Sequence, residues 1–318
     1  MTERRIGVAA MGGDSKTVLI RILDLEQRGI PAAWLTTGGA GLDALTVLAA
    51  AAAQTRGILL GTCIVPTYPR HPVVTAQQVQ VISALAPGRF RLGLGPSHKP
   101  TMEKIFGIDF KEPLTNLREY VHIVKTLLRE GAVEFDGRQY RAHARIDQPV
   151  ADVPIMASAL RRASYEFCGA ETDGAISWVC PYPYLRDVAL PAMKKGAGQA
   201  GRPAPPLIAH VPVCVDEDRG RVRAAARSEL SIYPRLPFYA RMFAEAGFPE
   251  AETTREWGDG MVDAVVASGD EGQVASRLLE LFDWGVGEII AHVISVGEDR
   301  TASRERTLRL LTDTSAKL

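Results

Sequence analysis

The polar residues best placed for chemistry follow directly after an apolar run near residue 90. FRLGLG (90–95) has the composition of a buried strand, and Pro96, Ser97 and His98 come immediately after it. In a barrel of parallel strands, the residues just past the carboxyl end of a strand lie on the active-site face. This position favours ligand contact for Gly95, Ser97 and His98 over the alternative that the glycines only ease strand packing.

The same segment, LGLGPSH, invites comparison with the glycine-rich fingerprint of dinucleotide-binding domains. Gly93 and Gly95 fit its first two positions, but His98 stands where G-x-G-x-x-G requires a third glycine. The fingerprint also requires a helix to begin at once, and we predict none directly after this strand. The Rossmann interpretation therefore fails.

Four other side chains could contact a ligand, and each has an ordinary structural alternative. His71 would sit at a helix N-terminus on the same face, where a local hydrogen bond is the better interpretation. Arg161 and Arg162 follow the fifth predicted strand and would either bind phosphate or carboxylate groups or be solvated. Trp178 ends the sixth predicted strand, with core packing as the default and stacking on a flat cofactor as the alternative.

The common catalytic motifs are missing from the sequence. It has no G-x-S-x-G nucleophile elbow, Walker loop, HExxH or CxxC motif. No second carboxylate is spaced to pair with Asp173, so glycosidase chemistry has no support. A site with glycine, serine and histidine but no acid–base pair indicates that a cofactor carries the chemistry.

Alternating strands and helices must position these residues. The sequence predicts strands at 5–10, 32–36, 58–65, 90–95, 153–159, 174–179, 207–215 and 288–295. Helix-length segments lie between most of them, including 42–55, 72–86 and 114–131. This alternation in 318 residues favours an α/β fold of the (β/α)8 TIM-barrel type, forming a single domain over 1–318, rather than an open doubly wound sheet.

Two segments exceed the repeating unit. VEFDGRQYRA (133–142) predicts a hairpin that turns at Asp136-Gly137. Residues 233–270 form a long excursion that mixes prolines and glycines with short helical stretches. An insertion of that length in a compact barrel indicates a lid or a pocket wall.

Composition and charge restrict the classes of function. The chain has 37 basic and 37 acidic residues, so no net field favours nucleic acid or an anionic membrane. No apolar run reaches the roughly 18 residues that span a bilayer, and the first residues lack a signal-peptide core. The cysteines lie in apolar runs without metal-ligand spacing, which predicts buried free thiols in a reducing cytoplasm, with no disulfide and no metal site: Cys63, Cys168, Cys180 and Cys214.

The sequence resembles the luciferase-like monooxygenase superfamily over most of its length. The similarity rests on VPTYPRHPVVTAQQVQVISALAPGRFRLGLGPSHKP, continuing through IFGIDF to NLREYV, on VPIMASALRRASYEFCGAETDGAISW, and on SGDEGQVASRLLELFDWGVGEIIA. It is weakest in residues 233–262. Within the superfamily, the sequence is most similar to the oxidoreductases that depend on coenzyme F420, a deazaflavin.

The resemblance implies where the cofactor would lie. The tricyclic ring would cross the carboxyl ends of the strands, with a non-prolyl cis peptide between Cys63 and Ile64 supporting its back. The loop after the fourth strand would lie near the polar edge of the ring or near the substrate, and it consists of Gly95, Pro96, Ser97 and His98.

The cofactor's phosphate-bearing tail would lie at the loop after the fifth strand. Backbone amides of Ser158, Ala159 and Leu160 would bind the phosphate. Relatives often carry Gly-Pro next, whereas this chain has Arg161-Arg162, which would either add charged contacts or indicate an altered tail site. Trp178 completes the set of residues that we expect to bind the cofactor.

A second departure concerns the substrate. Sugar-phosphate dehydrogenases of this superfamily place an Asp-His pair after the second strand, where this chain has Thr37 and Gly38. Alcohol oxidation with a histidine base is therefore not expected. The substrate pocket would be lined by the loops after Met11, Thr37 and Trp178 and by the 233–270 excursion.

The resemblance thus implies an enzyme that uses reduced coenzyme F420. A hydride would pass from C5 of the deazaflavin to an activated C=C, C=N or C=O bond of a small organic molecule, with His98 and Tyr68 as candidate proton donors. Two alternatives stay open: a monooxygenase that uses FMN, and a non-catalytic barrel that binds a flavin.

The resemblance also implies a homodimer. The alanine-rich helix at 42–55 offers a flat face that could pack against a partner, although burial within one chain explains that face equally well: Leu45, Leu48, Ala49 and Ala52.

Overall fold

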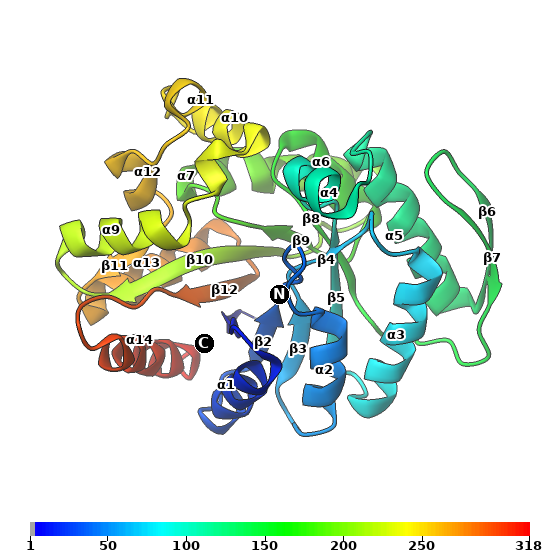
Figure 1. Cartoon of the computed structure of the whole chain (residues 1–318), viewed down its shortest axis with the longest axis horizontal. Coiled ribbons are helices and arrows are strands. Elements are labelled where there is room, and N and C mark those ends of the chain that lie inside the picture. The colour runs from blue at the N-terminus through cyan, green and yellow to red at the C-terminus, as the bar shows by residue number, and fades with distance from the viewer. Residues whose placement is uncertain (1–3) are drawn as a thin grey trace.

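The computed structural model describes residues 4–318 and contains a closed barrel of eight parallel strands (Figure 1). In barrel order the strands are β1 (Arg5–Ala9), β2 (Ala32–Leu35), β3 (Leu59–Thr62), β5 (Phe90–Gly95), β8 (Ile155–Ser158), β9 (Ala175–Ser177), β10 (Leu207–Val215) and β12 (Glu288–Val293). Pairing of β9 with β10, of β10 with β12 and of β12 with β1 closes the ring. The predicted TIM barrel is confirmed.

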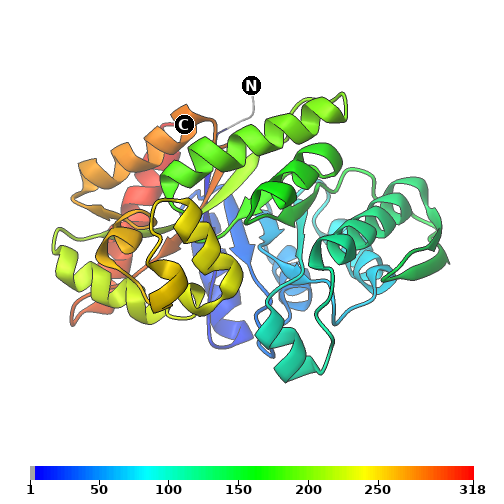
Figure 2. The same cartoon turned by 90° about the horizontal axis from the view of Figure 1, so that it is seen from above.

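Helices surround the strands, as the view from above shows (Figure 2). The longer helices are α1 (Ser15–Gln27), α3 (Pro72–Leu85), α5 (Pro113–Glu130), α6 (Arg162–Glu171), α8 (Leu190–Gln199), α9 (Arg219–Glu229), α13 (Glu271–Trp284) and α14 (Arg300–Ser315). The shorter helices are α2 (Ala44–Ala52), α4 (Lys99–Phe106), α7 (Tyr182–Tyr184), α10 (Pro237–Glu245), α11 (Ala251–Thr254) and α12 (Asp259–Asp263). The predicted helices at 42–55, 72–86 and 114–131 correspond to α2, α3 and α5, and Gly131 ends α5 in the left-handed conformation.

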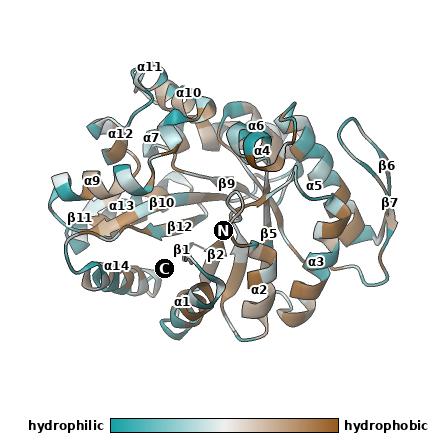
Figure 3. Cartoon of the chain, in the orientation of Figure 1, coloured by the Kyte–Doolittle hydropathy of each residue, from teal (hydrophilic) through white to brown (hydrophobic). Residues whose placement is uncertain are grey.

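Hydrophobic residues concentrate on the strands and on helices such as α2 and α3 (Figure 3). Leu45, Leu48 and Ala52 of α2 are buried in the chain's own core, so most of the face that the sequence offered to a partner is already covered. All four cysteines are buried and free, which confirms that prediction. Within residues 4–318, no helix is both long and apolar enough to cross a membrane.

An ion pair is buried in the interior of the barrel. The Arg91 guanidinium donates to both carboxylate oxygens of Glu288, at 2.5 and 2.9 Å, and Trp34 Nε1 donates to the same carboxylate at 2.8 Å. The Arg91 guanidinium also lies 4.3 Å from the centre of the Trp34 ring. At Gly61 a Cβ atom would come within 2.4 Å of that ring, so a glycine is required to make room for it.

The predicted hairpin is confirmed. Strands β6 (Ala132–Asp136) and β7 (Arg141–Arg145) pair antiparallel and project from the side of the barrel (Figure 1). The Glu119 carboxylate accepts hydrogen bonds from three backbone amides of the connecting turn, those of Arg138, Gln139 and Tyr140.

The excursion at 233–270 contains α10, α11, α12 and a short strand that the sequence did not predict, β11 (Ala267–Gly269), which pairs with β10. A hydrogen bond connects α10, the first α-helix of the excursion, to the barrel: Arg161, which precedes α6, donates to Glu245 of α10 at 2.7 Å. Tyr233 and Tyr239 of the excursion contact the ring of His98, which follows β5. These contacts make the excursion part of the wall above the strand ends.

Two local predictions were wrong. The strand expected over 58–65 is interrupted: β3 ends at Thr62 and pairing with β5 resumes only at β4 (Val65–Pro66). No helix was expected after His98, yet α4 begins at Lys99, with Pro100 in its first turn. The Rossmann interpretation still fails, because the strands close into a barrel.

Candidate active site at the carboxyl ends of the barrel strands

Apolar side chains line the carboxyl ends of the strands. Inside the barrel, Cys63 packs in a cluster with Ile176 and Ile290. Met11, Ile64 and Trp178, which follow β1, β3 and β9, pack against this cluster. We call this region, formed by Met11, Cys63, Ile64, Gly95, Ser158 and Trp178, the barrel mouth. Active sites of TIM barrels lie at this end of the strands, so the barrel mouth is the candidate active site.

The end of β3 has the peptide geometry that the resemblance implied. The bond between Cys63 and Ile64 is cis, although neither residue is proline. The neighbouring strand β2 secures the segment: Ile64 N–H donates to Thr36 Oγ1 at 3.2 Å, and Thr37 N–H donates to the Ile64 carbonyl at 3.0 Å. The predicted cis peptide is therefore confirmed, and the residues after β2 hold it in place.

On the β5 side of the Cys63–Ile64 segment, the side chain of Thr62 makes hydrogen bonds to β5 where strand pairing is interrupted. Thr62 Oγ1 donates to the Gly93 carbonyl at 2.9 Å and accepts from Gly93 N–H at 2.7 Å. A Cβ atom at Gly93 would lie 2.0 Å from the Thr62 carbonyl oxygen. The close contact between β3 and β5 thus depends on glycine at position 93.

The structure brings Gly95, Ile64 and Ser158 together. A Cβ atom at Gly95 would lie 2.4 Å from Ser158 Oγ and 2.9 Å from Ile64 Cγ1. Glycine at position 95 therefore lets Ile64 and Ser158, both predicted to contact the cofactor, pack directly against the backbone at the end of β5. Pro96 and Ser97 follow, and Ser97 turns the chain with a φ of 62°.

His98 belongs to an aromatic cluster above the barrel mouth. Its ring meets those of Tyr239 and Tyr233 edge-on, at centroid distances of 5.8 and 6.4 Å, and the two tyrosines lie 4.9 Å apart. Burial lowers the pKa of His98 to about 4. The imidazole is therefore neutral at physiological pH and is a poor proton donor there.

The backbone amides of the loop after β8 already donate hydrogen bonds to other groups of the protein. Ala159 N–H donates to the Ile176 carbonyl, and the amides of Leu160 and Arg161 donate to Ser164 Oγ at 3.1 Å. The Arg161 side chain is paired with Glu245. A phosphate at this loop would have to replace these acceptors. Arg162, by contrast, is exposed.

Two other polar candidates have structural roles. His71 Nδ1 accepts from Val73 N–H at the start of α3, and its Nε2 lies 3.0 Å from the Arg141 carbonyl. The interpretation of His71 as a locally hydrogen-bonded residue agrees with these contacts. The Tyr68 hydroxyl donates to the Lys111 carbonyl at 2.5 Å, so its proton already has an acceptor.

A hydrogen-bonded chain of two histidines and a glutamate lies beside the barrel mouth, and sequence analysis missed it. Val179 N–H donates to His210 Nδ1 at 3.3 Å, which leaves the proton of His210 on Nε2. His210 Nε2 donates to His292 Nδ1 at 3.1 Å, and His292 Nε2 donates to Glu229 Oε1 at 2.8 Å. Every nitrogen in the chain therefore has a partner.

The surroundings shift the pKa values of His210 and Glu229, the two ends of this chain. Burial lowers the pKa of His210 well below its ordinary value, and the neighbouring His292 lowers it further. Burial alone would raise the pKa of Glu229, but the hydrogen bond from His292 together with the charges of His292 and Arg300 outweighs that effect, and the pKa is lowered. His210 is thus neutral and Glu229 is ionised.

Trp178 links this chain to the excursion. Its ring stacks on His210 with a centroid distance of 3.6 Å and an interplanar angle of 20°. Its indole Nε1 donates to the hydroxyl of Tyr233 at 2.6 Å. Trp178 therefore stacks on His210, and its indole Nε1 points toward the excursion.

A signal for the two histidines was present in the sequence. The tetrapeptide Ile-Ala-His-Val occurs in both β10 and β12 and places one histidine within each apolar strand. No comparable signal marks Glu229 or Tyr233, because Glu229 is one of several charged residues of α9 and Tyr233 begins the irregular excursion.

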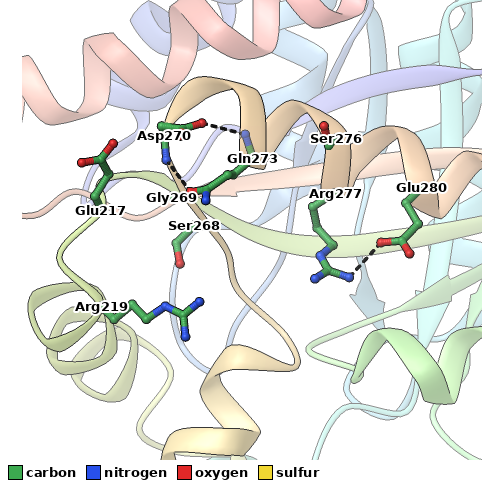
Figure 4. A pocket seen from close by; sticks show the side chains of 9 residues that line it. All are labelled: Glu217, Arg219, Ser268, Gly269, Asp270, Gln273, Ser276, Arg277 and Glu280. Atoms are coloured by element: carbon green, nitrogen blue, oxygen red, sulfur yellow. Dashed lines mark hydrogen bonds and ion pairs between the residues drawn. The ribbon is translucent and has the colours of Figure 1, made fainter.

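A separate hollow of about 590 Å³ lies away from the barrel mouth, around β11 and the start of α13 (Figure 4). Its charges are mixed and partly paired, since Arg277 donates to Glu280 and Asp270 accepts from the Gln273 amide. None of the predicted site residues lines it. The barrel mouth therefore stays the candidate active site.

Comparison with known proteins identifies the family that the chain resembles. The model of the luciferase-like monooxygenase family matches residues 5–288. Over 304 residues the chain is 26% identical to the 5,10-methylenetetrahydromethanopterin reductase of Methanolobus tindarius, covering 90% of this chain and 91% of that protein. Over 279 residues it is 30% identical to the F420-dependent glucose-6-phosphate dehydrogenase of Beutenbergia cavernae, covering 81% and 79%.

A solved structure shares the fold over almost its whole length. The coenzyme F420-dependent tetrahydromethanopterin reductase from Methanopyrus kandleri matches with a TM-score of 0.77 and 22% sequence identity. The match covers 99% of each chain.

Proposed function

This chain belongs to the luciferase-like monooxygenase family, and from that membership we propose that it is a coenzyme F420-dependent oxidoreductase of the luciferase-like class. Curated relatives with matches over most of the chain are F420-dependent enzymes or methylenetetrahydromethanopterin reductases. The cofactor of this chain is accordingly a deazaflavin, and its reaction is a two-electron transfer.

The observation that carries this proposal is the group of apolar side chains at the barrel mouth. Ile64 and Ser158 pack directly against Gly95, where a Cβ atom would clash, and Met11 and Trp178 add apolar side chains nearby. A tricyclic ring fits such a surface, because binding removes apolar area on both the ring and the protein from water. Ile64 and Gly95 would hold the ring, with Cys63 beneath it.

The loop after β8 has few unpaired polar groups for the phosphate-bearing tail of the cofactor. Leu160 N–H and Arg161 N–H share Ser164 Oγ as acceptor, and the Arg161 side chain is paired. Arg162 is exposed and has no ion pair within residues 4–318, so we assign to it the first contact with the phosphate. Ser158, Ala159 and Leu160 would border the tail.

We assign a reductase reaction to the barrel mouth. When bound and reduced, the deazaflavin supplies a hydride from C5 to an activated C=C, C=N or C=O bond of a small organic molecule. The chain's own residues orient the two reactants and exclude water. Sugar-phosphate oxidation is not proposed, because Thr37 occupies the expected place of the catalytic pair and its hydroxyl accepts from Ala44 N–H at the start of α2.

Turnover with reduced coenzyme F420 tests this proposal. Purified protein is mixed with the reduced cofactor and one acceptor at a time: cyclohex-2-enone, a cyclic imine or a ketone. We expect at least one acceptor to restore the absorbance of oxidised F420 at a rate proportional to enzyme concentration. Failure of all three, together with oxygen consumption in the presence of reduced FMN, would contradict the reductase reaction and favour a monooxygenase.

We further propose a homodimer in the cytoplasm. Family membership supports the dimer, and four free buried cysteines suit a reducing compartment. Most of the α2 face considered from sequence is buried in the monomer, so the dimer contact would have to lie elsewhere. The molar mass in solution, measured by light scattering, tests the dimer.

A further inference from the structure

The hydroxyl of Tyr233 has an unusual pattern of hydrogen bonding. An indole N–H can only donate, so the Tyr233 oxygen is the acceptor in its 2.6 Å bond with Trp178 Nε1. The hydroxyl hydrogen of Tyr233 has no acceptor within residues 4–318. This hydrogen is therefore available for a bound molecule.

The position of Tyr233 suits contact with a substrate. Its ring borders His98 and Tyr239, and its hydroxyl accepts from Trp178, which packs against the cluster that contains Cys63. Cys63 lies beneath the place assigned to the cofactor ring. Tyr233 itself belongs to the excursion at 233–270.

The bond partner of Tyr233 is held rigidly. Trp178 stacks on His210, and the orientation of His210 is set by Val179 N–H on one side and by His292 on the other. Glu229 completes the chain by accepting from His292. This arrangement fixes the plane of the indole, and with it the direction of the Nε1–H bond toward Tyr233.

The other candidate proton donors are less suitable. Burial lowers the pKa of His98 to about 4, so it carries no extra proton at neutral pH. Tyr68 donates its proton to the Lys111 carbonyl. The hydroxyl of Tyr239, the other phenol beside His98, has no hydrogen-bond partner within residues 4–318, so it lacks the fixed N–H donor that Trp178 gives to Tyr233.

We propose that Tyr233 is the proton donor of the reductase reaction and that Trp178 orients it, with His210, His292 and Glu229 as positioning residues behind Trp178. This inference rests on the proposed function, in which reduced deazaflavin supplies the hydride. As the hydride bonds to one atom of the C=C, C=N or C=O group, the π electron pair moves to the other atom. That atom takes the proton as the Tyr233 O–H bond breaks, and the tyrosinate then regains a proton from solvent.

The energetics of this step are favourable. Burial raises the pKa of Tyr233 to about 12, while the hydrogen bond from Trp178 opposes the rise. Tyr233 is thus protonated at neutral pH, yet it is a stronger acid than the alcohol or the carbon acid that its proton creates. The indole N–H then stabilises the tyrosinate through a charge-assisted hydrogen bond.

A Tyr233→Phe variant tests the proposal in the full chain. We expect kcat for cyclohex-2-enone with reduced F420 to fall at least about 100-fold, as is typical when a general acid is removed. The dissociation constant for F420 should change less than about threefold. Trp178→Phe keeps an aromatic ring but loses the N–H, and we expect kcat to fall about 10-fold because the tyrosinate loses its donor.

A measurement on the protein without cofactor tests the hydrogen bond between Trp178 and Tyr233. In apo-protein labelled with ¹⁵N at tryptophan, the indole N–H resonance of Trp178 is identified by its loss in Trp178→Phe. We expect this resonance to move upfield in Tyr233→Phe, since a short hydrogen bond has been removed. Tyr68→Phe is the matched control, and it should alter neither that resonance nor, by more than about threefold, the turnover.

The outcomes separate this inference from the proposed function. If the wild type turns over and Tyr233→Phe retains kcat within threefold, or if Tyr68→Phe loses activity instead, Tyr233 is not the donor although the enzyme is a reductase. An unmoved Trp178 resonance would show that the hydrogen bond is absent and would also overturn the inference. If the wild type binds no F420, the proposed function fails, and this inference fails with it.

Discussion

The Arg91→Met variant is expected to have a free energy of unfolding about 3–5 kcal/mol below that of the wild type. Arg91 is buried inside the barrel, where its guanidinium donates twice to Glu288 and packs on the Trp34 ring. Methionine removes the positive charge and leaves the Glu288 carboxylate buried, with Trp34 Nε1 as its one remaining side-chain donor among residues 4–318. Equilibrium unfolding in urea measures the loss.

Two further variants establish the cause of this effect. Arg91→Met combined with Glu288→Met removes both charges and should recover part of the lost stability, because no uncompensated charge stays in the barrel. Arg306→Met breaks the exposed pair with Glu271 and should cost no more than about 1 kcal/mol. Equal losses for Arg91→Met and Arg306→Met would show that the interior pair has no special role.

The Gly93→Ala variant is expected to lose about 3 kcal/mol of stability and most of its affinity for F420. The new methyl group would lie 2.0 Å from the Thr62 carbonyl oxygen, so β3 and β5 must separate. Separation breaks the paired hydrogen bonds between Thr62 and Gly93. The Cys63–Ile64 segment follows Thr62 directly, so the surface that would hold the cofactor ring moves with it.

Gly198→Ala is the matched control for this substitution. Gly198 is exposed in α8, and a Cβ atom there would meet nothing within 4 Å. Alanine should stabilise the protein slightly, by about 0.5–1 kcal/mol, because it lowers the backbone entropy of the unfolded chain. Wild-type F420 affinity in Gly93→Ala, measured by fluorescence titration, would contradict the assigned cofactor surface.

The barrel could be predicted from sequence because its signals are local. Apolar runs such as 207–215 and 90–95 mark buried parallel strands, and helices of ordinary length separate them. The end of β3 could not be predicted from these signals, since the run from Ile58 to Val65 is apolar almost throughout. The strand is interrupted because Thr62 bonds to Gly93 through its side chain, a contact between residues 31 positions apart.

Part of the candidate site could also be predicted, because some of its residues lie at the ends of predicted strands. Gly95 ends β5 and Ile64 comes shortly after β3, so their contact could be expected once a barrel was assumed. The chain from His210 through His292 to Glu229 joins residues 82 and 63 positions apart, and spacing along the sequence does not reveal such partners. Tyr233 belongs to an excursion whose path depends on tertiary contacts, including the bond to Trp178.

The central claim is that the barrel mouth binds a deazaflavin. The most direct test is a side-by-side fluorescence titration of purified apo-protein with coenzyme F420 and with FMN. We expect saturable binding of F420 at one site per chain, with FMN bound at least about tenfold more weakly. Preferential binding of FMN would contradict the account and would identify oxygen-dependent chemistry as the next activity to measure.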